Sequence, residues 1–138
     1  MTANEAVASL DAMVKNNIDS DEKVKWLLAL DGRYYLQVVK PYDLPCDTSN
    51  GWQSAVSDAA GIESTTAVVD TDAAMLIPYP YSEIYETYLL SRLYLATSEP
   101  QRFAAASSMF EREWSRLCAD ASRSFRQASV HSIHGGAV

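Results

Sequence analysis

The sequence predicts an all-α domain. Its 138 residues suffice for one hydrophobic core, and 48% of them are hydrophobic against 21% charged, which is a globular composition. Apolar residues recur at three- and four-residue steps in four stretches, whereas β-prone runs are short. We therefore expect a four-helix bundle-like domain over residues 1–126, a long acidic loop between its second and third helices, and a flexible C-terminal tail over 127–138.

The first two helices have recognisable ends. Thr2 and Glu5 have the spacing of a capping box, so a helix is expected from about residue 3 to 15. Asp19 opens a second helix with acids in its first turn, where the helix dipole favours them, and Pro41 ends it. Their apolar stripes, expected to be buried, are Ala6, Val7, Leu10, Met13 and Val14, and then Val24, Leu27, Leu28, Tyr34, Tyr35, Val38 and Val39.

The middle of the chain is predicted to lack helices. Proline and glycine recur through residues 41–64, which indicates a loop. The segments 65–69 and 74–77 are β-prone and flank a turn-like stretch, a pattern compatible with a small β-hairpin. A connection of this length is uncommon in a compact domain and is often functional.

The last two helices are predicted to form an antiparallel pair. Ser82 is expected to cap the third helix, and Ser98 with Gln101 forms a second capping-box spacing at the start of the fourth. The very short joint between them places the two helices side by side. Their stripes are Ile84, Tyr85, Tyr88, Leu89, Leu93 and Ala96, and then Phe103, Ala106, Phe110, Trp114, Leu117 and Ala121, and the last helix is expected to end after Phe125.

The negative charge is concentrated in the middle third. The chain has a net charge of −7, and residues 41–81 contain six acids without a single lysine or arginine. The six are Asp43, Asp47, Asp58, Glu63, Asp70 and Asp72. They form either a solvated acidic loop or a surface that repels a polyanion or meets a basic partner. The acidic balance argues against a protein that grips nucleic acid through its phosphates.

The sequence lacks the motifs of the common catalytic and cofactor sites, so we expect no enzyme, no cofactor and no metal centre. His131 and His134 fall in the expected tail, which offers nothing to orient two metal ligands. Cys118 has no nearby base that would activate a thiol, and Cys46 falls in the acidic loop, which is expected to raise the pKa of its thiol. Neither a signal peptide nor a membrane-spanning run is visible, so the chain is expected in a cytosol.

Tyrosines and arginines are the candidate interaction residues. Tyr79, Tyr81, Tyr85 and Tyr88 either wedge between helices or form a protein interface, where tyrosine is enriched. Arg112, Arg116 and Arg123 either form a solvated face, with pairs such as Glu113 to Arg116, or meet the acidic segment of a neighbouring copy. The second option gives a head-to-tail contact, which closes into a ring or extends as a filament.

Three segments in order carry a resemblance to a known family. They are KWLLALDGRYY at 25–35, LIPYPYSEIYETYL at 76–89, and a helix with Glu99, Arg102, Phe103, Ala106, Phe110 and Trp114. Over about residues 5–123 the chain resembles the head–tail connector (adaptor or head-completion) proteins of long-tailed bacteriophages. Its middle loop and its polar tail depart from the family pattern.

The resemblance implies a helical virion protein without catalytic residues. Such proteins form a ring, twelve-fold by this resemblance, beneath the portal protein, and they join the DNA-filled head to a tail-side connector or tail-completion protein. DNA would pass through without specific binding, and the acidic loop would line the lumen or face a partner. The protein would be made in the host cytoplasm and reside in the virion neck. The alternative is an acidic cytosolic helical protein-binding module, such as a regulator or an inhibitor of a host factor.

Overall fold

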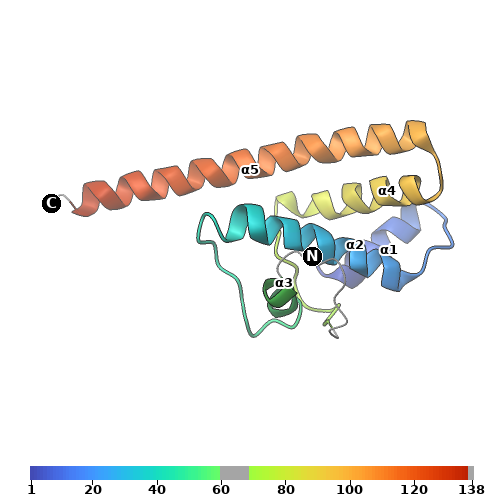
Figure 1. Cartoon of the computed structure of the whole chain (residues 1–138), viewed down its shortest axis with the longest axis horizontal. Coiled ribbons are helices and arrows are strands. Elements are labelled where there is room, and N and C mark those ends of the chain that lie inside the picture. Colours follow the sequence, from blue (N-terminus) through green and yellow to red (C-terminus); the bar gives the residue numbers. More distant parts are fainter. Residues whose placement is uncertain (60–68, 137–138) are drawn as a thin grey trace.

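The computed structural model describes residues 1–59 and 69–136, with side chains described over 1–58 and 69–127. The described residues form five α-helices and no strand, which confirms the all-α class (Figure 1). The helices are α1 (Ala3–Met13), α2 (Ser20–Tyr34), α3 (Gln53–Ala59), α4 (Ile84–Ala96) and α5 (Pro100–Gly136). A π-helical turn, Tyr35–Val39, extends α2, and a 3-10 turn, Tyr81–Glu83, precedes α4.

Helix α4 is the central element. It packs along α5 on one side and against α1 and α2 on the other (Figure 1). The short helix α3 packs on α2, and it lies on the side of the molecule away from α5 (Figure 1). At a rise of about 1.5 Å per residue, the 37 residues of α5 extend about 55 Å and the 13 of α4 about 20 Å. The C-terminal part of α5 therefore projects well past its partner helix.

The first helix begins as the sequence predicts. The Glu5 N–H donates to Thr2 Oγ1 at 3.2 Å, and the Thr2 N–H donates to Glu5 Oε1 at 3.3 Å, which completes the capping box. The stripe is confirmed at Ala6, Val7 and Leu10, which are buried. It is wrong at Met13, the last residue of α1, which is 53% exposed.

Part of the expected loop is a helix. Asn50 Oδ1 accepts the N–H groups of Trp52 and Gln53, at 2.9 and 3.0 Å, and so satisfies donors that open α3. Burial of Trp52 and Val56 against the helical body then stabilises this short helix. The prediction missed α3 because turn residues surround it and its seven residues are too few for a periodic pattern.

The predicted hairpin is not formed by the described residues. Ala74 makes an isolated bridge with Thr2, and the Met75 N–H donates to the Met1 carbonyl at 3.0 Å. The segment 74–77 thus forms its backbone-to-backbone hydrogen bonds with the N-terminal residues, because the start of α1 lies beside it. Most of the other expected strand, at 65–68, lies outside the described residues.

Both predicted caps of the last two helices are wrong. Ser82 lies inside the 3-10 turn, and Glu83 occupies the N-cap position of α4. Ser98 has a φ of 59°, which belongs to the turn between the helices. The carbonyl of Glu99 instead accepts the Phe103 N–H at 2.9 Å at the start of α5.

The last helix is longer than predicted. Helix α5 continues through 127–136, so the expected end after Phe125 is wrong. The sequence-based boundary at residue 126 does not coincide with a helix end, and the flexibility of the tail stays a prediction. The side chains of His131 and His134 lie outside the described residues.

The stripe of α5 forms one wall of the core. Phe110, Trp114 and Leu117 are each at most 4% exposed. The guanidinium of Arg33, from α2, lies over the Trp114 ring at 4.4 Å from its centroid and over Phe110 at 5.7 Å. This stack joins α2 to α5 directly, in addition to the packing of both on α4.

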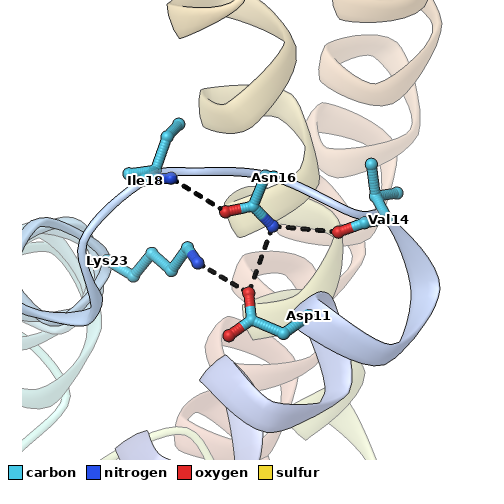
Figure 2. Close-up of polar contacts among 5 residues, drawn as sticks. All are labelled: Asp11, Val14, Asn16, Ile18 and Lys23. Carbon is cyan, nitrogen blue, oxygen red and sulfur yellow. Dashed lines mark hydrogen bonds and ion pairs between the residues drawn. The ribbon is translucent and has the colours of Figure 1, made fainter.

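A buried lysine fixes the joint between α1 and α2. Lys23 is 2% exposed, and its Nζ donates to Asp11 Oδ1 at 2.6 Å. Asn16, from the connecting segment, also donates to Asp11 Oδ1, and its own side-chain oxygen accepts the Ile18 N–H (Figure 2). The bond from Lys23 is the main cause that lowers the pKa of Asp11.

Removing Asp11 is expected to cost more stability than removing Lys23. Asp11→Ala leaves a buried ammonium group without this carboxylate and should lower the free energy of unfolding by about 2 kcal/mol. The loss is smaller than for a fully buried pair because Asp11 is 44% exposed. Lys23→Met keeps the aliphatic stem without a charge and should cost about 1 kcal/mol or less. Urea unfolding measures both variants, and equal losses would contradict this account of the joint.

Candidate functional site

The most unusual polar site is a carboxylate in the core. Asp31 of α2 is 0% exposed, because it follows Leu27 and precedes Tyr34 on the buried side of the helix. Its Oδ2 accepts the indole Nε1–H of Trp52 at 2.7 Å and the Leu76 N–H at 3.0 Å. Its Oδ1 accepts the hydroxyl of Tyr85 at 2.5 Å. One side chain thus joins α2 to α4 and to both described parts of the segment between them.

The electrostatics of this cluster follow from burial. Loss of solvation raises the pKa of Asp31 to about 6, although all three hydrogen bonds favour the charged form. Burial and the neighbouring carboxylate together raise the pKa of Tyr85 well above its ordinary value. The same two causes raise the pKa of Tyr34 to about 12. The tyrosine hydroxyls therefore remain protonated donors at neutral pH.

A carboxyl group with a pKa near neutrality can serve as a general acid or base when it faces a pocket. Asp31 has no exposed surface, and its three donors all belong to this chain. The Tyr85 hydroxyl in turn accepts the Ile77 N–H at 2.7 Å. The arrangement is a structural anchor that holds the segment around residues 52 and 76 against the helical body.

Side-chain amides organise the same segment. Asn50 Nδ2 and Gln53 Nε2 both donate to the Ala74 carbonyl, each at 3.1 Å. Gly51 approaches residue 70 so closely that an added Cβ would lie 2.8 Å from the Cβ of Asp70. Glycine at this position therefore allows the two parts of the segment to pack together.

The four candidate tyrosines have different environments. Tyr79 is 89% exposed, in a segment flanked by two prolines. Tyr85 is 0% exposed and its hydroxyl donates to Asp31, so of the two options for this residue the structure contradicts the interface and supports packing between helices. Tyr88 is half-buried and contacts the Phe110 ring, with centroids 5.1 Å apart. Sequence spacing alone could not separate these environments, because all four residues lie near the start of one helix.

Tyr81 belongs to a surface hollow between α4 and α5. Its hydroxyl donates to Asp120, which also accepts a hydrogen bond from Arg123 at 2.6 Å. The hollow has a volume of about 180 Å³. Its lining residues are Pro80, Tyr81, Glu83, Ile84, Glu113 and Arg116. Tyr81 and Arg116 therefore lie at this hollow, and Arg123 reaches Tyr81 through their shared partner Asp120, while the assignment of these residues to an interface stays a prediction.

The predicted pair between Glu113 and Arg116 is replaced by another contact. Glu113 Oε2 accepts the Thr87 hydroxyl at 2.8 Å, which links α5 to α4. Arg112, Arg116 and Arg123 are all exposed, as the sequence predicts for a solvated face.

The acidic residues of the middle segment are mostly surface groups. Asp43, Asp47, Asp58, Asp70 and Asp72 are exposed, and Glu63 lies outside the described residues. Asp47 Oδ1 accepts both the N–H and the hydroxyl of Ser49, which lowers the pKa of Asp47. Asp72 Oδ1 accepts from the Asn4 side chain at 2.6 Å. Part of the acidic segment therefore has local structural roles besides its charge.

The two cysteines have the character of packing residues. Both are half-buried, and burial raises the pKa of each thiol, with Asp47 adding to the effect at Cys46. Raised thiol pKa values disfavour the reactive thiolate. Among the residues with described side chains, no three His, Cys, Asp or Glu residues lie close enough together to hold a metal ion.

Comparisons with known protein families, curated proteins and solved structures find no match to this chain. Within the described part of the chain, none of the helices has both the length and the apolar character needed to cross a bilayer.

Proposed function

We propose that this protein is a structural virion protein, a head–tail adaptor that oligomerises as a ring beneath the portal and joins the DNA-filled head to the tail. Its partners in this role are further copies of itself, the portal protein and a tail-side connector or tail-completion protein. It acts without a cofactor and without a catalytic step, and DNA passes through the ring without specific binding.

One observation carries the proposal: the three segments of the resemblance contact one another through their distinctive residues. Asp31 of the first segment accepts hydrogen bonds from Leu76 and Tyr85 of the second. Arg33 of the first segment lies over Phe110 and Trp114 of the third. The D-G-R sequence in α2 therefore links all three segments, which is what one shared fold would require of an ordered set of motifs.

The shape of the molecule also suits an assembly role. Helix α5 projects past α4 (Figure 1) and presents exposed arginines, while the opposite side carries exposed acids and α3. Interfaces are enriched in tyrosine and arginine, and Tyr79 with the hollow beside Tyr81 supplies such groups on the surface.

Deleting the gene is expected to block the joining of heads to tails. Infection should yield DNA-filled heads and free tails, and the chain supplied in trans should restore joined particles. Electron microscopy of the lysate and cryo-EM of complemented particles check this, with added density expected in the neck. Intact, infectious particles that lack this polypeptide would overturn the proposal and favour an acidic binding module that acts on a host factor.

A further inference from the structure

One face of α5 is basic over residues 102–126. Arg102, Met109, Arg116 and Arg123 recur at seven-residue intervals, and Arg112 and Arg126 lie in the adjoining row. All six are exposed. These six residues are called the basic face below. The remaining positions of these two rows are alanines 105 and 119, which are also exposed, and neither row contains an acid.

Most of this charge is available to a partner. Arg102 pairs with Glu99, the residue just before α5, at 3.3 Å, and Arg123 pairs with Asp120 of the same helix at 2.6 Å; both partners are three residues away in sequence. Among the described side chains, no carboxylate lies within ion-pair distance of Arg112, Arg116 or Arg126. The other two acids of α5 make contacts elsewhere: Glu111 pairs with Arg33, and Glu113 accepts the Thr87 hydroxyl.

A complementary surface lies on the opposite side of the molecule. The exposed residues Asp47, Asp58, Asp70 and Asp72 belong to α3 and its flanking segments, in a stretch without lysine or arginine. This group is called the acidic side below. Helices α2 and α4 lie between α3 and α5 (Figure 1). The basic face therefore cannot reach the acidic side of its own chain.

We propose that the basic face of α5 docks against the acidic side of a second copy of this chain, so that copies associate head to tail. The inference deepens the proposed ring and rests on it. A contact between two basic faces or two acidic sides would be repulsive, whereas unlike surfaces attract. Because each copy carries both surfaces on opposite sides, the contact repeats and closes into a ring or extends.

Nucleic acid is the other kind of partner that a row of arginines could bind. Two observations favour a protein. The chain has a net charge of −7, which repels a polyanion at a distance. The basic face also contains Met109, which is 47% exposed, with the exposed Ala105 one turn before it, so another surface can approach closely there. Phosphate contacts would make no use of these apolar groups.

The test uses the full chain and three variants, with assembly followed by analytical ultracentrifugation and native mass spectrometry. Arg112→Glu/Arg116→Glu disables the basic face. Asp47→Asn/Asp58→Asn/Asp70→Asn/Asp72→Asn disables the acidic side but keeps an accepting oxygen at each position. Lys15→Glu/Lys25→Glu, at exposed lysines outside α5, makes the same change in net charge as the first variant and is the matched control.

The wild-type chain and the lysine control are expected to self-associate at low salt and to dissociate as salt is added. Each of the other two variants should associate at least ~tenfold more weakly, since each removes several ion pairs from every contact. Mixed together, these two variants should form a one-to-one complex and nothing larger, because one contact remains intact. That stoichiometry is specific to a head-to-tail contact.

Three results would overturn the inference: a wild-type chain that stays monomeric up to about 1 mM at low salt, an arginine variant that assembles as the wild type does, or a wild-type chain whose basic face binds duplex DNA instead. These results are separate from the test of the proposed function. If the chain is present in the neck but both variants assemble as the wild type does, this contact alone is overturned. A chain absent from the particle that still associates through these surfaces would overturn the virion role alone.

Discussion

Trp114→Ala is expected to lower the free energy of unfolding by about 3–5 kcal/mol, the usual range for a buried aromatic side chain cut back to a methyl group. Trp114 is 4% exposed and contacts Tyr34 edge-on, with ring centroids 6.4 Å apart. The variant also removes the ring beneath the Arg33 guanidinium and so weakens the direct link between α2 and α5. Urea unfolding followed by circular dichroism measures the loss.

Met109→Ala is the matched control for this prediction. Met109 is a large apolar residue of the same helix, but it is 47% exposed, so its loss should change monomer stability by about 0.5 kcal/mol or less. Phe110→Ala, at a buried position, should behave like Trp114→Ala. If both aromatic variants melted like the wild type, this stripe of α5 would face a partner and not the core.

The monomer is expected to become more stable as the pH falls from 7 to about 4.5. Burial raises the pKa of Asp31 from 3.8 to about 6, so the folded state favours the protonated carboxyl more strongly than the unfolded chain does. The stabilisation from this proton is fully present below the pKa that Asp31 has in the unfolded chain. It is lost as the pH rises through the pKa that Asp31 has in the folded state. Between pH 7 and about 4.5, protonation of Asp31 is expected to raise the free energy of unfolding by about 2 kcal/mol.

Asp31→Asn isolates the contribution of this one group. The variant cannot titrate, so the gain of stability on acidification should disappear from it while other groups titrate as before. The difference in unfolding free energy between wild type and variant, measured by urea unfolding at several pH values, reports Asp31 alone. Below about pH 4 the wild type should lose stability for other reasons, because the lowered pKa of Asp11 acts with the opposite sign. A difference that does not change with pH would contradict the assignment.

The helices were predictable wherever the apolar pattern was long enough. The 3.6-residue period located α1, α2, α4 and α5, because each must bury one stripe against the others. Predictions of the capping residues at the helix ends were less reliable. The capping box of Thr2 is formed as its spacing predicts, whereas Ser82 and Ser98 lie in a 3-10 turn and a positive-φ turn. A capping residue is recognised by backbone geometry, which sequence spacing alone does not determine.

The anchor at Asp31 was missed although the sequence contained a sign of it. An aspartate on the buried side of an apolar helix, four residues after Leu27 and three before Tyr34, must find partners in the core. Its partners are 21, 45 and 54 residues away along the chain. Only the folded chain shows that Trp52, Leu76 and Tyr85 converge on this carboxylate, and that Tyr85 is therefore a core residue.

The sequence by itself determined the all-α class, the stripes of the long helices and the separation of charge into an acidic middle segment and an arginine-rich last helix. These properties follow from periodicity and composition, which act over neighbouring residues. The tertiary structure decided which polar groups are buried, which tyrosines remain exposed, and that the acidic and basic surfaces lie on opposite sides of one molecule. Such relations depend on packing between segments far apart in the chain, where a single contact is stable only if the whole core forms around it.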